Sequence, residues 1–78
     1  MEIEIIIFGQ LTDIFKTGKL RFRCAASDTE GLIGDLNRKY PGFENARYTI
    51  AVNKQTITQN SMLHEGAVVA LMPPFSGG

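Results

Sequence analysis

Hydrophobic and polar residues alternate along three segments of the chain, residues 2–8, 19–25 and 48–52. This spacing is typical of β-strands with one buried face. In the first segment the isoleucines at odd positions share one face, and Ile6 and Phe8 make the end of the other face apolar as well. We therefore expect the first strand to be central in its sheet, with its second face partly covered.

Two further segments complete the predicted sheet. The run at 67–72 is almost entirely apolar and predicts a buried final strand. It follows a polar turn at 64–66. The stretch 56–58 predicts a short strand after another polar turn at 53–55.

Two stretches carry the spacing of an amphipathic helix. The longer one follows Ser27 and Asp28, which compete as N-cap residues, and it ends at a Pro-Gly pair. Gly31 and Gly34 are costly inside a helix, and they predict that this helix lies close to the sheet. Residues 11–16 predict one or two helical turns. The apolar stripe of the long helix comprises Leu32, Ile33, Leu36 and Tyr40.

The order of elements is strand, short helix, strand, long helix, and then two or three strands. One long helix on one face of a mixed sheet of four to five strands is an α+β roll. Ubiquitin's β-grasp architecture has this order. We therefore expect a β-grasp domain over residues 1–72 and an extended tail over residues 73–78.

The composition is that of one small globular domain. Of 78 residues, 44% are hydrophobic and 21% are charged, whereas a disordered chain is poorer in apolar residues. Eight Lys plus Arg balance eight Asp plus Glu, so we expect neither nucleic acid nor a membrane surface as a partner. Because no segment resembles a signal peptide or a membrane span, we expect a cytoplasmic protein.

The C-terminal tail is the strongest functional feature. Pro73 and Pro74 cannot continue a sheet ladder and predict a stiff, extended segment after the last strand. Gly77 and Gly78 let the main chain enter a passage too narrow for a side chain. The terminal carboxylate is ionised at neutral pH and suited to attack the α-phosphorus of ATP. This combination favours a functional arm over a frayed chain end.

The tail sequence LMPPFSGG at 71–78 closely resembles the C-terminal signature of the small subunit of molybdopterin synthase. In that family apolar residues, Pro-Pro, an apolar residue, a small residue and Gly-Gly follow one another. The stretch 63–70 resembles the family's Leu-x-x-Gly-Asp-x-Val-Ala, although Ala67 replaces the acidic residue. Residues 8–11 resemble the start of the family's first helix, and 51–53 resemble its turn before the fourth strand.

The resemblance implies a sulfur carrier. Gly78 would be adenylated by a ubiquitin-activating-type adenylyltransferase that consumes ATP, and then converted to a thiocarboxylate. The tail would next enter the large subunit of the synthase, which contains the catalytic residues. The small and large subunits would together form a heterotetramer. There the sulfur would pass to precursor Z, cyclic pyranopterin monophosphate. The chain itself would bind no cofactor and no metal ion. The tail residues involved would be Pro73, Pro74, Phe75, Ser76, Gly77 and Gly78.

The strand pattern also predicts an apolar patch beside the tail. Exposed apolar patches often mark interfaces, although residues on both faces of a central strand can instead belong to the core. The predicted patch comprises Ile6, Phe8, Val68, Ala70 and Met72. The candidate contacts to a partner are the patch residues other than Ile6, together with Phe75 of the tail.

Other functions stay open at this point. Related carriers for thiamine thiazole or cysteine synthesis share the Gly-Gly ending, but the Pro-Pro pair and the short first helix favour the molybdopterin branch. A protein modifier or a non-catalytic ubiquitin-like binding module is a further alternative. An independent enzyme is the weakest hypothesis, because His64 lies in a predicted turn and Cys24 on an apolar strand face.

Overall fold

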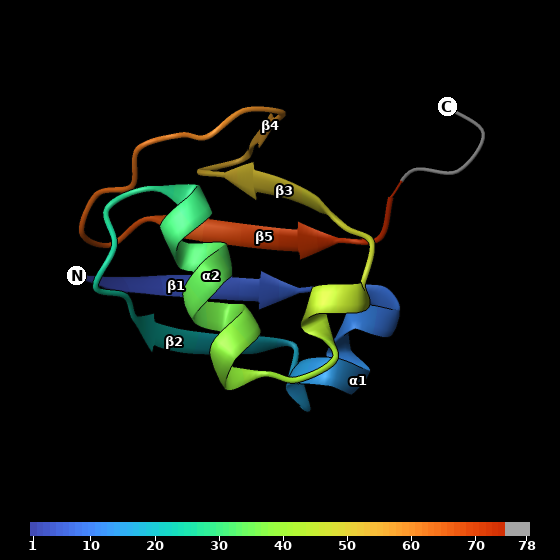
Figure 1. Ribbon diagram of the computed structural model, residues 1–78. Helices are drawn as coiled ribbons and strands as arrows, with labels where there is room; N and C mark the ends of the chain where they lie inside the picture. The colour runs from blue at the N-terminus through green and yellow to red at the C-terminus, as the bar shows by residue number, and fades with distance from the viewer. Residues whose placement is uncertain (75–78) are drawn as a thin grey trace.

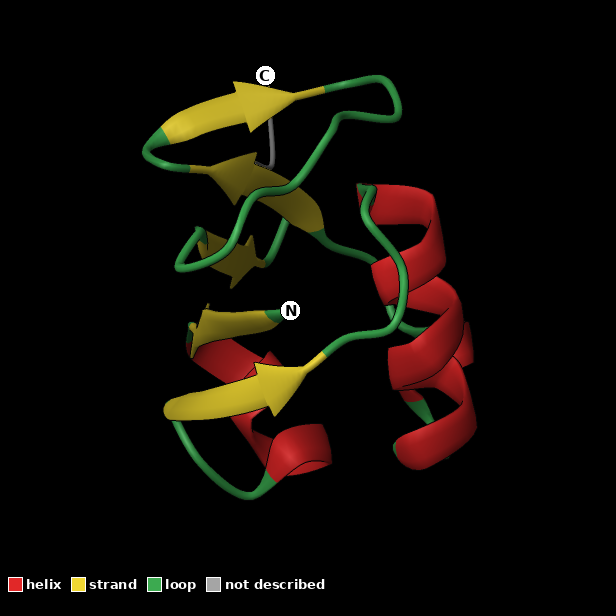
Figure 2. Ribbon diagram, turned by 90° about the vertical axis from the view of Figure 1, so that its left-hand side faces the viewer, coloured by secondary structure: helices red, strands yellow, loops and turns green. Residues whose placement is uncertain are grey.

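The computed structural model describes residues 1–74. One five-stranded sheet in the order β2-β1-β5-β3-β4 carries a helix, α2, across one face (Figures 1 and 2). The strands are β1 (Glu2–Ile7), β2 (Lys19–Arg23), β3 (Thr49–Val52), β4 (Gln55–Ile57) and β5 (Val68–Met72). The helices are α1 (Thr12–Phe15), α2 (Thr29–Lys39) and the single 3-10 turns η1 (Gly9–Leu11) and η2 (Phe43–Asn45). The predicted α+β roll is confirmed.

Strand β5 lies in the middle of the sheet. It pairs in parallel with β1 on one side and antiparallel with β3 on the other. Because β1 and β5 run in the same direction, both end at the same edge, beside η1 and α1 (Figure 1). The tail therefore leaves the domain from the centre of the sheet.

The core lies between the sheet and α2. The odd-numbered residues of β1 face the helix and are at most 4% exposed, as their alternation predicts. Fully buried side chains from β5 and α2 meet them, namely Val69, Leu71, Leu32 and Leu36. At the tail end of the sheet, Phe15 packs against the ring of Phe43 at 5.2 Å between centroids, and Tyr48 stacks on Phe43 at 4.8 Å. The sequence pattern did not predict η2, which brings Phe43 into this cluster.

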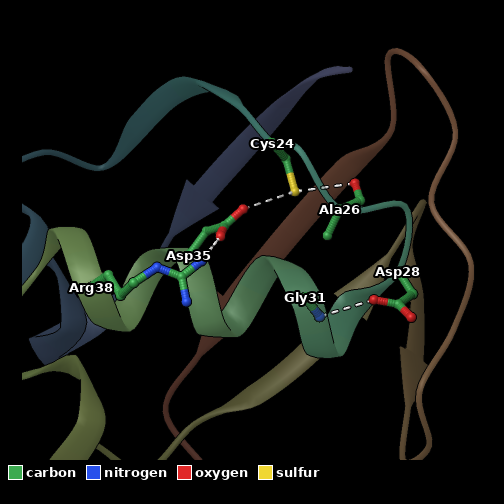
Figure 3. Close-up of polar contacts among 6 residues, drawn as sticks. All are labelled: Cys24, Ala26, Asp28, Gly31, Asp35 and Arg38. Atoms are coloured by element: carbon green, nitrogen blue, oxygen red, sulfur yellow. Dashed lines mark hydrogen bonds and ion pairs between the residues drawn. The ribbon is translucent and has the colours of Figure 1, made fainter.

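The N-terminus of α2 is capped by Asp28, so of the two competing N-cap residues Asp28 is confirmed and Ser27 is wrong. The Gly31 N–H donates to Oδ1 of Asp28 at 2.9 Å (Figure 3). Asn60 donates to Oδ2 of Asp28 at 3.1 Å, and its own Oδ1 accepts from the Glu30 N–H at 2.9 Å. The hydrogen bonds from Asn60 and Gly31 lower the pKa of Asp28 below its ordinary value. The loop before β5 is thereby fixed to the start of the helix.

The two glycines of α2 do not bring the helix close to the sheet, contrary to the sequence prediction. A Cβ on Gly31 would lie 2.2 Å from the Cβ of Ala26, in the segment that leads into the helix. A Cβ on Gly34 would meet only the Arg38 side chain, at 3.8 Å. Gly31 therefore leaves room for Ala26 in the segment that precedes the helix. At position 34, packing does not require a glycine.

The turn between β3 and β4 holds two residues in the left-handed region, Asn53 at φ 49° and Lys54 at φ 75°. A two-residue hairpin turn of this kind prefers Asn-Gly. We therefore expect Lys54→Gly to raise the free energy of unfolding by about 1 kcal/mol, measured by urea denaturation. Asn53→Gly should not stabilise the protein, because Oδ1 of Asn53 accepts the Val68 N–H at 3.0 Å. Equal or lower stability of the Lys54→Gly protein would refute this explanation.

Candidate functional site

The start of the tail is held in a fixed place. Pro73 and Pro74 follow β5 directly and are exposed. The Phe8 N–H donates to the Leu71 carbonyl at 3.0 Å, which extends the pairing of β1 and β5 to the end of both strands. Just beyond, Gly9 lies against the ring of Pro73, where an added Cβ would be 2.6 Å from the proline Cγ. The direction in which the tail leaves is therefore set by this contact.

Gly9 is a site residue that the sequence analysis did not single out. Its backbone is left-handed, with φ 61°, so both its conformation and its contact with Pro73 favour a glycine. The available signal was a glycine directly after a strand, which indicates a close backbone approach without naming the partner. The predicted tail residues Phe75, Ser76, Gly77 and Gly78 lie outside the described residues, and their roles stay predictions.

The predicted apolar patch lies on the sheet face opposite α2. Phe8 has extended backbone and is 48% exposed, so the alternation of β1 continues through it. Ile6 pairs with Ala70, which pairs in turn with Ala51 of β3. Val68 and Met72 lie on the same face of β5, and none of the five predicted residues belongs to the buried core. The alternative that these side chains fill the core is wrong.

Ion pairs border this patch on the side of β2. Lys19 Nζ lies 3.4 Å from Oε2 of Glu4, and Arg21 Nη1 lies 3.9 Å from Oε1 of Glu2. These four residues are exposed or half-buried on neighbouring strands. An apolar surface with a charged border is the usual composition of a protein interface.

Cys24 is a buried thiol and not a reactive group. Its side chain is completely inaccessible and donates to the Ala26 carbonyl at 3.3 Å, with the Asp35 carboxylate at 3.6 Å (Figure 3). Burial, with the Asp35 charge beside it, raises the pKa of the Cys24 thiol. The thiolate that sulfur chemistry requires is therefore disfavoured at neutral pH.

We expect Cys24→Ser to weaken the fold and spare the function. A hydroxyl in this fully buried place should lower the free energy of unfolding by about 1–3 kcal/mol, measured by urea denaturation. Conversion of the protein to a sulfur-charged form should proceed at the wild-type rate, followed by intact mass. If a folded Cys24→Ser protein cannot be converted to the form that carries sulfur, the Cys24 thiol takes part in that conversion.

Further features of the described residues concern metal binding, the position of His64 and membrane-spanning helices. Over residues 1–74, no group of three or more His, Cys, Asp or Glu side chains is arranged to hold a metal ion. His64 is exposed in the turn before β5, where the sequence places it. Within the same range, no helix is both long and apolar enough to cross a membrane.

Residues 5–78 match the ThiS family. The chain belongs to this family. One relative is the molybdopterin synthase sulfur carrier subunit of Arabidopsis thaliana. It is 25% identical over 81 residues, an alignment that covers 100% of this chain and 84% of the relative. The resemblance stated from the tail and the turn motifs is thus confirmed.

Two solved structures show how this ThiS-family fold is shared. The putative molybdopterin converting factor subunit 1 of Pyrococcus furiosus matches with a TM-score of 0.86 and 16% identity, over 95% of this chain and 98% of that one. A chain from the complex of subunits 1 and 2 of the Helicobacter pylori molybdopterin-converting factor matches with a TM-score of 0.74 and 28% identity, over 100% of both chains. The predicted ubiquitin-like β-grasp fold is confirmed.

Proposed function

We propose that this ThiS-family protein is the sulfur-carrying small subunit of a molybdopterin synthase. The observation that carries the proposal is the tail: a Pro-Pro-Phe-Ser-Gly-Gly sequence follows the central strand of a ThiS-family domain, from a start fixed by Gly9. Residues 1–72 act as the docking domain, and residues 73–78 act as the arm that reaches into the partners.

The proposed reaction takes place on the carboxylate of Gly78. It attacks the α-phosphorus of ATP within an adenylyltransferase of the ubiquitin-activating type, and pyrophosphate leaves. Hydrosulfide supplied by the sulfur donor then attacks the carbonyl carbon of the acyl-adenylate, AMP leaves, and a thiocarboxylate remains. In the large subunit of the synthase this group donates its sulfur to precursor Z. The side chains that catalyse these steps belong to the two partners, and this chain needs no cofactor of its own.

The apolar patch on the open sheet face is proposed to hold the large subunit. Its position beside the start of the tail lets one partner cover the patch and receive the tail together. Support comes from the Helicobacter pylori structure, which is a complex of subunits 1 and 2. Contacts are assigned to Phe8, Val68, Ala70 and Met72, with Phe75 of the tail. We place this assembly in the cytoplasm, without a nucleic acid or membrane partner.

The decisive experiment is intact mass after incubation with ATP, a sulfur donor and the host's adenylyltransferase. A gain equal to replacing one oxygen by sulfur, located at Gly78, is the expected result. Molybdopterin formation on adding the large subunit and precursor Z then separates this function from thiamine and cysteine carriers. An unchanged mass with a demonstrably active adenylyltransferase would refute the carrier and leave a ubiquitin-like binding module.

A further inference from the structure

A groove of about 350 Å³ lies at the base of the tail. Three segments that are far apart in the sequence meet there: η1 with α1, the chain that leads into β3, and the start of the tail. In Figure 1 the chain between η2 and β3 passes beside the end of β5, where the tail begins. The lining residues are Gln10, Leu11, Ile14, Ala46, Arg47, Pro73 and Pro74.

The groove combines an apolar lining with one cation. Leu11 is 4% exposed, and Ile14 and Ala46 are half-buried, whereas Arg47 is exposed. Among the described residues, the ion pairs join β1 to β2 and Asp35 to Arg38, so no carboxylate in residues 1–74 forms an ion pair with Arg47. A guanidinium offers a planar set of N–H donors that matches a carboxylate. The groove therefore fits an apolar side chain with an acidic residue next to it.

The groove shares no lining residue with the apolar patch, but the two adjoin, because Pro73 follows Met72 directly and Gln10 is two residues beyond Phe8. A carrier of the proposed kind must bind two partners in turn. A broad apolar face suits a lasting subunit interface. A small groove with one exposed charge suits a transient partner, because exposed charges mainly speed association and remain sensitive to salt.

We propose that the tail-base groove is the docking site of the adenylyltransferase, which inserts an apolar side chain and pairs an adjacent Asp or Glu with Arg47. This inference rests on the proposed function, since it names the surface that presents the tail for activation. Two walls of the groove are the prolines of the tail itself, so a protein seated there also fixes the direction of the tail.

The test is the KM of the carrier in pyrophosphate release by the host's adenylyltransferase. Arg47→Glu should raise KM about tenfold and leave kcat unchanged, and the difference should shrink as salt is added. Arg47→Lys should retain part of the affinity. Lys54→Glu is the matched control: it makes the same charge change on an exposed turn at the opposite end of β5, so its KM should stay at the wild-type value.

A second variant tests the apolar part of the groove. Ala46→Leu should fill it and raise KM as well, while circular dichroism shows an unchanged fold. If the wild-type protein is adenylated and Arg47→Glu has the KM of Lys54→Glu, the groove proposal alone is overturned. If Arg47→Glu weakens only binding of the large subunit, the assignment to the adenylyltransferase is wrong. If the wild-type protein is not adenylated at all, both proposals fail.

Discussion

Removal of Gly77 and Gly78 should abolish sulfur transfer and leave the fold intact. The last strand ends at Met72 and the core at Leu71, so the free energy of unfolding should stay within about 0.5 kcal/mol of the full-length value. The truncated chain still ends in a carboxylate, but two missing residues shorten its reach by about 7 Å. Intact mass should show no sulfur adduct, and molybdopterin should not form.

The control for this truncation is Ser76→Ala, which changes a tail side chain but keeps the length and both glycines. It should be charged with sulfur much as the wild-type protein is. Gly78→Ala should be impaired, because a methyl group enters the narrowest part of the proposed passage. Molybdopterin synthesis by the truncated protein would disprove the proposed carrier function, since that function places the sulfur on the carboxylate of Gly78.

Gly9→Ala should have the second largest effect, and it should act on the tail. The new Cβ would be 2.6 Å from Cγ of Pro73, an atom of a rigid ring, so the main chain at the start of the tail must shift. An alanine held in the left-handed backbone conformation of Gly9 should lower the free energy of unfolding by about 1–2 kcal/mol. A displaced tail should lower the rate of adenylation on the order of tenfold or more, because small misplacements of a reacting group are costly.

Gly66→Ala is the matched control for this variant. Gly66 is also left-handed, at φ 82°, but an added Cβ there has no neighbour within 4 Å. Both variants should lose the stability that a left-handed alanine costs, and Gly9→Ala should lose more because of its contact with Pro73. Only Gly9→Ala should be slow in adenylation. Equal adenylation rates for the two proteins would show that Gly9 is needed only for its backbone conformation.

Most of the fold could be predicted from the sequence, because the signals are local. The alternation of isoleucines in β1 gave its buried face, and the Pro-Gly pair after Tyr40 marked the end of α2. The short strand β4 was predicted as 56–58 and is found at Gln55–Ile57. The failed predictions for α2 were decided by local contacts: Asp28 and not Ser27 accepts the Gly31 N–H, and Gly31 lies against Ala26. The bond from Asn60 to Asp28 could not be predicted at all, because the two residues are 32 positions apart.

The candidate site divides in the same way. The tail and the apolar patch are visible in the sequence, since the tail is a contiguous motif and the patch follows from strand alternation. The contact between Gly9 and Pro73 is not visible, because it depends on β1 and β5 pairing in parallel and ending together. The role proposed for Arg47 could not be predicted from the sequence either, because only the folded structure places this exposed basic residue in a groove.

The central position of β5 also determines how the protein responds to mechanical force. A pull on the tail is directed along β5, whose hydrogen bonds to β1 and β3 run across the strand. Both rows of bonds are then loaded in shear together, whereas the edge strand β4 could be peeled away one bond at a time. We therefore expect the domain to resist unfolding most strongly when it is pulled by its tail along β5.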